Sequence, residues 1–206
     1  RWTFRHTEGG QTFDKTIRIE TVKPNKLDIS LNFNDKYITP DKDCTGDVAV
    51  NWLYGAPGSK LKVDGTVNLT SAETTFKGYE SYDFKDDSRE FQDMSMSYKD
   101  LTTDDKGHVT INTYFDLNRS KVPGMLNADF TIRAFEPSGD FSTSSTSMKL
   151  SAFKTYVGIK TTLDKSAWGD EFLKSGKPHR FDVVTLNPDG KPVGAGNLHV
   201  EIFHVD

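Results

Sequence analysis

The sequence predicts an all-β protein whose strands pair antiparallel and pack as β-sandwiches. Apolar residues alternate with polar ones along most of the chain, for example at Val109, Ile111 and Phe115, and this period of two is typical of a strand with one buried face. Turn sequences such as Glu136-Pro137-Ser138-Gly139-Asp140 recur about every ten residues, which favours an antiparallel sandwich. Helical periodicity is poor throughout, so we predict no helical domain.

The stretch from Val48 to Leu69 contains two strand patterns joined by a turn. Every second residue from Val48 to Trp52 is large and apolar, and the same alternation resumes before Leu69. Between them lies Tyr54-Gly55-Ala56-Pro57, in which glycine allows a positive φ and proline fixes φ near about −65°. We therefore predict a sandwich hairpin here, and these four residues are assigned a structural rather than a catalytic role.

A second copy of this pattern lies near the C-terminus. The turn and the strand before it recur at an offset of 135 residues, in the pairs Gly55 and Gly190, Pro57 and Pro192, and Val48 and Val183. The flanks recur at offsets of 130 to 133, in the pairs Ile17 and Met148, Ile19 and Leu150, Leu27 and Val157, Ile29 and Ile159, Val67 and Val200, and Leu69 and Ile202. Solenoid repeats have periods of roughly 20–50 residues, so this spacing indicates whole domains in tandem. The alternative is that any two β-hairpins look alike.

The repeat divides the chain into three parts. Residues 1–24 match the end of a module, residues 25–152 form one complete module, and residues 153–206 are the start of the next. The chain opens at Arg1 without a methionine and stops within an apparent strand at Asp206, so we expect a fragment of a longer protein. Unpaired edge strands invite further pairing; we therefore expect an edge-paired or swapped dimer, or pairing between the two ends.

Composition excludes several classes of function. The net charge is −4 and the pI is near 5.7, and the basic residues are scattered, which argues against a nucleic-acid-binding surface. No run of 18 apolar residues is present, so the sequence predicts no membrane-spanning helix. Cys44 is the only cysteine; it lies in a turn-like stretch, cannot form an intrachain disulfide, and is interpreted as an incidental small residue rather than a reactive thiol.

Three places in the sequence resemble bacterial alpha-2-macroglobulin family proteins. The first is Leu53-Tyr54-Gly55-Ala56-Pro57 with the Val-Asp-Gly-x-Val strand that follows it. The second is the joint from Ile19 to Leu27, which resembles the passage between two macroglobulin (MG) domains of that family. The third is Asp189-Gly190-Lys191-Pro192-Val193, which resembles the corresponding hairpin of the following domain. The resemblance implies tandem MG domains, each a seven-stranded antiparallel β-sandwich.

The resemblance also implies a function for the parent protein. It would be a secreted or lipid-anchored protein, in the periplasm or at the cell surface, that traps or inhibits proteases. In many family members a bait region is cut and a Cys-x-Glu-Gln thioester couples to the protease. Cys44 is followed by Thr45 and Gly46 instead, and no bait region is recognisable. This segment would therefore be a non-catalytic scaffold without cofactor or metal, and its partners would be neighbouring MG domains and, through the parent, proteases.

Two groups of residues in the sequence are candidate metal ligands. His199 and Glu201 lie two residues apart, hence on one face of a strand, but His204 has the opposite parity and zinc sites normally use three or four protein ligands. Acidic residues that could bind calcium through oxygen are Asp83, Asp86, Asp87, Asp93, Asp100, Asp104 and Asp105. The spacing of an EF-hand loop is absent, so solvated turns explain the aspartates better.

Two other functions remain open from the sequence. An immunoglobulin-like segment of a bacterial surface adhesin or stalk would show the same sandwich repeat. A carbohydrate-binding module would present a row of exposed aromatic residues on one sheet, for which the candidates are Tyr79, Tyr82, Phe84 and Trp168. An enzyme is the class that the sequence favours least.

Overall fold

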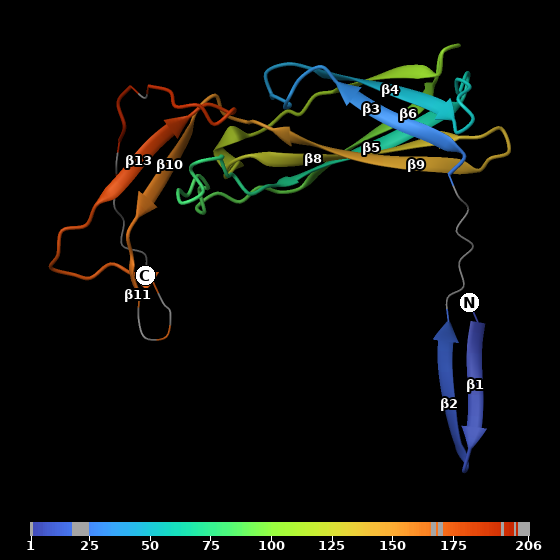
Figure 1. The fold of residues 1–206 in the computed structure, drawn as a ribbon, viewed down its shortest axis with the longest axis horizontal. Helices are drawn as coiled ribbons and strands as arrows, with labels where there is room; N and C mark the ends of the chain where they lie inside the picture. Colours follow the sequence, from blue (N-terminus) through green and yellow to red (C-terminus); the bar gives the residue numbers. More distant parts are fainter. Residues whose placement is uncertain are drawn as a thin grey trace.

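The computed structural model describes residues 2–17, 25–165, 168, 171–194, 196–199 and 201, and Figure 1 shows the course of the chain. In chain order its elements are β1 (Trp2–Glu8), β2 (Gln11–Ile17), β3 (Leu27–Phe33), β4 (Cys44–Trp52), β5 (Lys62–Ser71), β6 (Met94–Thr102), β7 (His108–Thr113), the 3-10 turn η1 (Arg119–Lys121), β8 (Leu126–Phe135), β9 (Phe141–Leu150), β10 (Tyr156–Thr161), β11 (Asp164–Lys165), β12 (Glu171–Phe172) and β13 (Phe181–Leu186). Within these residues, no helix has the length and apolar character needed to cross a membrane.

Seven strands form a sandwich of two antiparallel sheets. One sheet has the order β3-β4-β7 and the other β6-β5-β8-β9, and the two lie over each other in the upper part of Figure 1. Every pairing between named strands is antiparallel. The predicted all-β class and the seven-stranded antiparallel sandwich are therefore confirmed.

The core of the sandwich consists of the inward positions of both sheets. Side chains that are fully buried there include Val48, Val50, Val63, Val67, Leu69, Phe130 and Leu150. Buried and partly exposed residues alternate strictly along β5 and β8, because each inward residue is followed by one that is at least partly exposed. Removing a fully buried Val, Leu or Phe side chain from water stabilises a fold by about 1.5–3 kcal/mol, so this period-two pattern is what holds the sheets together.

Polar contacts close one side of the sandwich between β3 and β9. The hydroxyl of Ser142 accepts hydrogen bonds from the backbone N–H groups of Lys26 and Leu27, each at 3.2 Å. At the other end of β9, the Ile38 N–H donates to Lys149 C=O and the Ser151 N–H donates to Ile38 C=O. The connection between β3 and β4 is thereby fixed against the opposite sheet.

The structure corrects the prediction of a hairpin from Val48 to Leu69. Strands β4 and β5 belong to opposite sheets, because β3 and β7 occupy the two edges of β4. The chain crosses between the sheets at residues 58–61, where the buried Thr103 hydroxyl accepts from Leu61 N–H at 2.8 Å and donates to Gly58 C=O at 2.5 Å. Lys60 turns the chain with a φ of 56°. The stretch is an arch that joins the sheets.

The aromatic stretch from Phe76 to Phe84 is not a strand. It lies in the irregular connection of residues 72–93 between β5 and β6. Turn hydrogen bonds run from Tyr79 N–H to Phe76 C=O and from Tyr82 N–H to Tyr79 C=O. These local bonds use backbone groups that a sheet would need. The segment therefore forms turns, and its aromatic rings pack in a cluster with Tyr156 and Leu186.

The remaining strands form three small two-stranded sheets, β1-β2, β10-β13 and β11-β12. Within the described residues the strands of the two ends do not pair with each other, so the predicted pairing between the ends is not found there. Predictions for residues 18–24, which include Ile19, and for Val200, Ile202 and His204 lie outside the described residues.

Candidate interface between the two modules

The two predicted turn motifs have the same backbone hydrogen bonds. In the first motif, Trp52 N–H donates to Ala56 C=O, Gly55 N–H to Trp52 C=O, and Gly58 N–H to Val50 C=O, at 2.7–2.8 Å. Pro57 forms an antiparallel bridge with Asn51. Gly55 has a φ of +91°, a region that residues with a Cβ rarely adopt, which explains the need for glycine.

The second motif repeats each of these bonds 135 residues later. Asn187 N–H donates to Lys191 C=O, Gly190 N–H to Asn187 C=O, and Val193 N–H to Thr185 C=O, all at 2.9 Å. Pro192 bridges Leu186, and Gly190 has a φ of +76°. The two motifs therefore have the same local fold.

The pairing of the strands before each motif extends the match. Val48 pairs with Leu31 in the β3-β4 hairpin, and Val183 pairs with Ile159 in the β10-β13 hairpin. The register therefore places Ile159 on Leu31, at an offset of 128 residues. The offset of 130 that alternation alone predicted for this strand is wrong by two residues, because a shift by two leaves the apolar pattern unchanged.

The two equivalent hairpins bury opposite faces. In β10-β13 the face equivalent to the sandwich core is open: Val157, Ile159, Phe181 and Val183 are each 40–49% exposed. They line a hollow of about 410 Å³ together with Leu198, His199 and Glu201. The outward face is buried instead, since Tyr156 is 3% exposed and Leu186 is 0% exposed.

The buried face of β10-β13 packs on the connection of residues 72–93 and on Met125, the residue before β8. Tyr156 and Leu186 form one apolar cluster with Phe76, Phe84 and Met125. The ring centroids of Phe76 and Phe84 are 4.8 Å apart with an edge-to-face geometry, an arrangement that aromatic pairs favour. This cluster, which we call the joint, connects the complete sandwich with the hairpin that follows it.

Gly158 of β10 lies against the ring of Phe84. A Cβ built at this position would lie 2.4 Å from Cε1 of Phe84, so only glycine leaves room for the ring at this place. Next to it, Asp83 and Ile159 exchange two backbone hydrogen bonds of 2.8 and 2.9 Å. The connection of residues 72–93 therefore pairs with the edge of β10 at Asp83. Side-chain packing and backbone hydrogen bonds both hold the two segments together.

An ion pair spans the joint at its surface. Lys36 Nζ donates to Asp189 Oδ1 at 2.5 Å, from the connection after β3 to the turn of the second motif. This hydrogen bond holds the pKa of Asp189 below its usual value of 3.8 and raises the pKa of Lys36. Because both groups are exposed, the pair contributes little stability, but it links the connection after β3 to the turn after β13 at a defined point.

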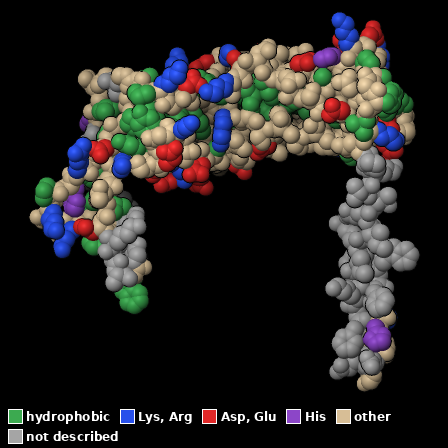
Figure 2. Space-filling view, in the orientation of Figure 1, with side chains coloured by type: hydrophobic (Ala, Val, Ile, Leu, Met, Phe, Trp, Pro, Cys, Tyr) green, Lys and Arg blue, Asp and Glu red, His purple; other side chains and the backbone are tan. Residues whose placement is uncertain are grey.

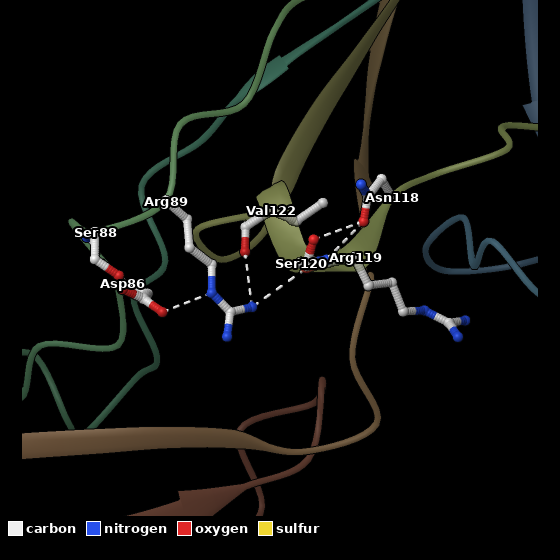
Figure 3. Close-up of polar contacts among 7 residues, drawn as sticks. All are labelled: Asp86, Ser88, Arg89, Asn118, Arg119, Ser120 and Val122. Carbon is white, nitrogen blue, oxygen red and sulfur yellow. Dashed lines mark hydrogen bonds and ion pairs between the residues drawn. The ribbon is translucent and has the colours of Figure 1, made fainter. Parts of the chain in front are cut away.

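Arg89 holds the connection of residues 72–93 against the sandwich (Figure 3). Its Nε lies 2.6 Å from Asp86 Oδ2, and its Nη1 donates to the carbonyls of Arg119 and Val122 at 3.2 and 3.5 Å. The guanidinium also lies 5.9 Å from the ring centroid of Phe153. One side chain thus links three segments that support the joint.

The neighbours of Arg89 are themselves held by short polar contacts (Figure 3). The Ser88 hydroxyl donates to Asp86 Oδ1 at 2.5 Å, and this bond, together with the Ser88 amide and Arg89, holds the pKa of Asp86 below its usual value. Asn118 Oδ1 accepts from the amide and the hydroxyl of Ser120, which caps η1. The carboxylate of Asp86 therefore holds this turn in place.

The other candidate residues do not form a site among the described residues. His199 Nε2 lies 2.7 Å from Glu201 Oε1, but the described chain contains no group of three potential metal ligands. Asp104 accepts from the amides of Lys106 and His108 in a turn. Figure 2 shows acidic and basic side chains interspersed over the visible face of the sandwich.

Two further residue predictions are resolved by the fold. Cys44 is the first residue of β4 rather than part of a turn; it is 1% exposed, and burial raises the pKa of its thiol. The candidate aromatic row is not on one sheet: Phe84 is buried in the joint, Tyr79 and Tyr82 pack beside it, and Trp168 is 92% exposed in a separate segment.

Sequence reasoning missed the joint because its residues come from irregular segments. Phe76, Phe84 and Arg89 lie outside any strand, and Gly158 lies in a strand where glycine is disfavoured. That glycine was the available signal, because glycine inside a strand often marks a close approach of another group.

Comparison with known proteins places these observations in one family. The family described as bacterial alpha-2-macroglobulin MG5 domain matches residues 25–148. The alpha-2-macroglobulin of Rickettsia conorii is 28% identical over 199 residues, which is 93% of this chain and 10% of that relative. This chain thus spans about a tenth of the length of that relative.

Solved structures show the same fold. The native conformation of Escherichia coli alpha-2-macroglobulin has a TM-score of 0.63 at 20% identity, covering 92% of this chain and 12% of that one. A mutant of Salmonella alpha-2-macroglobulin has a TM-score of 0.63 at 17% identity, covering 93% and 13%. With more than half of its residues matched by the family, this chain belongs to the bacterial alpha-2-macroglobulin family, and residues 25–148 correspond to its MG5 domain.

Proposed function

We propose that this chain is a non-catalytic scaffold segment of a bacterial protein that traps proteases, and that its role is to hold two successive MG modules in a fixed relation. Residues 1–24 are the end of one module, residues 25–152 a complete module, and residues 153–206 the start of the next. The observation that carries this proposal is the joint, in which Phe84 packs directly on Gly158.

The joint has the properties expected of a rigid connection. Its apolar cluster is buried, and two backbone hydrogen bonds join Asp83 and Ile159. Arg89 ties the connection to the sandwich by donating to the carbonyls of Arg119 and Val122. Interfaces between domains allow relative motion unless they are large and hydrophobic. A module that moves during trapping would therefore carry its neighbour with it, which is how a scaffold segment would transmit a rearrangement.

The open face of β10-β13 supports the tandem arrangement. Its four exposed apolar residues occupy the positions whose equivalents in the first module face the sandwich core. A hydrophobic face of this kind is stable only when another sheet covers it. We infer that later strands of the parent protein cover it and complete a second sandwich.

The test uses the full-length parent protein. Purified parent is mixed with a protease, and we measure the remaining cleavage of a protein substrate and the co-elution of protease with the parent. We expect the protease to be retained and its cleavage of the large substrate to fall. The Gly158→Val variant should lose much of this trapping, whereas Ser30→Val, at the equivalent but exposed position of β3, should keep it. A parent that neither retains nor inhibits any of several proteases contradicts the proposal.

The alternative is a segment of a surface stalk or adhesin, for which the repeated module is the supporting observation. A stalk would retain no protease, and both variants would then behave like the unaltered parent. For either function we propose that the parent protein is located in the periplasm or at the cell surface, where a lipid anchor could hold it. Fractionation of cells followed by immunodetection of the parent tests this location. Recovery of the parent in the cytoplasmic fraction contradicts it.

A further inference from the structure

One end of the sandwich carries large apolar side chains that are exposed to solvent. Leu53 is 67% exposed and Tyr54 is 78% exposed, and the Tyr54 ring stacks on Trp52 with centroids 5.8 Å apart and an interplanar angle of 15°. We call Trp52, Leu53 and Tyr54 the tip. Figure 2 shows apolar side chains at the right-hand end of the sandwich, where β4 ends in Figure 1.

The tip occupies the same place in its module as residues 187–189 do in the second module. The shared hydrogen-bond pattern places Leu53 on Pro188 and Tyr54 on Asp189. Asp189 forms the ion pair across the joint. The neighbouring Gly190 lies against the ring of Phe76, where an added Cβ would be 3.1 Å from Cδ1. At the second module, therefore, this turn is one of the parts that contact the module before it.

The chain also enters the module beside the tip. Leu53 N–H donates to Lys26 C=O at 3.0 Å, so the residues before Lys26 lead directly to this surface. The equivalent pair in the second module is Lys154 and Pro188, which both line an open groove of about 780 Å³ together with Tyr37 and Arg119 of the sandwich. In both modules the turn thus lies next to the point where the preceding module must be attached.

We propose that the tip is the docking surface for the β-sandwich module that precedes residue 25 in the parent protein. The proposal rests on the tandem arrangement put forward above. The contact is confined to the tip, because the positions equivalent to Tyr156, Gly158 and Leu186 are polar in the first module. They are Asp28, Ser30 and Asn51, and polar groups without partners are costly to bury.

The chemistry of the tip specifies what it contacts. Asp189 in the second module meets a lysine, whereas Tyr54 is uncharged and stacked on an indole ring. The preceding module should therefore present an apolar or aromatic surface where this sandwich presents Lys36. Burying Tyr54 and Leu53 there would remove from water the two most exposed large apolar side chains among the described residues of this module, which is favourable.

Photo-crosslinking in the full-length parent tests the proposal. Tyr54 is replaced by p-benzoylphenylalanine, which keeps an aromatic side chain, and the cross-linked peptides are identified by mass spectrometry. We expect adducts with the module before residue 25. The control carries the same substitution at Tyr114, which is 52% exposed and follows the end of β7 that pairs with Cys44, opposite the tip. Adducts from position 54 to any other part of the parent, or none, overturn the proposal.

Hydroxyl-radical footprinting supplies a second measurement without substitution. Oxidation of Tyr54 and Leu53 should be several-fold slower in the parent than in the 206-residue chain, while Tyr114 serves as the reference. Equal oxidation in both overturns the docking. The two proposals fail in different ways: a parent without a β-sandwich before residue 25 contradicts the tandem scaffold, whereas a parent with one that leaves Tyr54 exposed contradicts only the docking surface.

Discussion

The hairpins β3-β4 and β10-β13 have the same strand register and the same turn but bury opposite faces. In the first, Val48 is fully buried in the sandwich core; in the second, the equivalent Val183 is 40% exposed. The outward face of the first is polar at Ser30, whereas the second has Gly158 under an aromatic ring. The comparison teaches that the local fold of a hairpin and the burial of its faces are set separately.

The physical reason lies in what each hairpin meets. Backbone pairing and turn geometry depend on nearby residues, with glycine and proline at fixed positions. Burial depends on which sheet or loop lies opposite, which for β3-β4 is the four-stranded sheet and for β10-β13 is the connection of residues 72–93. The predictions below use equivalent positions in the two hairpins to test this separation.

The largest contrast is expected for an aspartate at the two equivalent valines. Val48→Asp places an unpaired carboxylate in the core and should destabilise the chain by about 4–5 kcal/mol or more, because buried charges without partners are among the most costly changes. Val183→Asp should change the urea midpoint of the 206-residue chain very little. Equal loss for both would show that the open face is buried in solution, which contradicts the comparison.

The next contrast tests the close contact of the joint. Gly158→Val forces its side chain into the Phe84 ring and should cost about 1–3 kcal/mol, as overpacking does. We expect the hydrogen exchange of the Ile159 amide, which donates to Asp83, to become faster by up to about a hundredfold, while amides of β8 remain protected. Ser30→Val is the matched control; faster exchange in the control as well would mean that the joint is not the cause.

A smaller contrast concerns the two turn glycines. Gly55→Ala and Gly190→Ala both place a Cβ at a positive φ, which should cost about 1–2 kcal/mol. Gly190→Ala should cost more, because its Cβ would also press on Phe76, whereas nothing lies within 4 Å of the Cβ at Gly55. Thermal unfolding of both variants measures the difference, and a larger loss for Gly55→Ala would refute this account of the joint.

The smallest effect is the pH dependence of the ion pair between Lys36 and Asp189. Because the pKa of Asp189 is lowered in the folded chain, the ion pair contributes to stability above the usual value of 3.8, and this contribution is lost as the pH falls through the lowered pKa. In Lys36→Met, the protection of joint amides against hydrogen exchange, relative to the intrinsic exchange rate at each pH, should depend less on pH in that acidic range.

The control for this pair is Lys42→Met. Lys42 Nζ lies 2.9 Å from Asp35 Oδ1, in an exposed pair that does not involve the β10-β13 hairpin or its turn. Its loss should leave the acid dependence of the joint unchanged, and a similar change in both variants would assign the effect to general surface charge.

The sequence by itself determined the fold class and the local turns. Alternation at Val109 and Ile111 predicted a half-buried strand, and the Gly-x-Pro pattern at Gly55 and Gly190 predicted two turns, which have equivalent hydrogen bonds. These features depend on residues that are close along the chain, so a period of two and the allowed φ of glycine are sufficient to predict them.

Only the tertiary structure decided which strands pair and which faces are buried. Strand β4 pairs with β7 rather than β5, and a shift of two residues in β10 was invisible in the pattern. Phe84 and Arg89 lie in an irregular connection with no periodic signal, yet they build the joint. Such contacts join residues far apart in sequence, and their choice depends on packing and on closing long loops, which a local pattern does not contain.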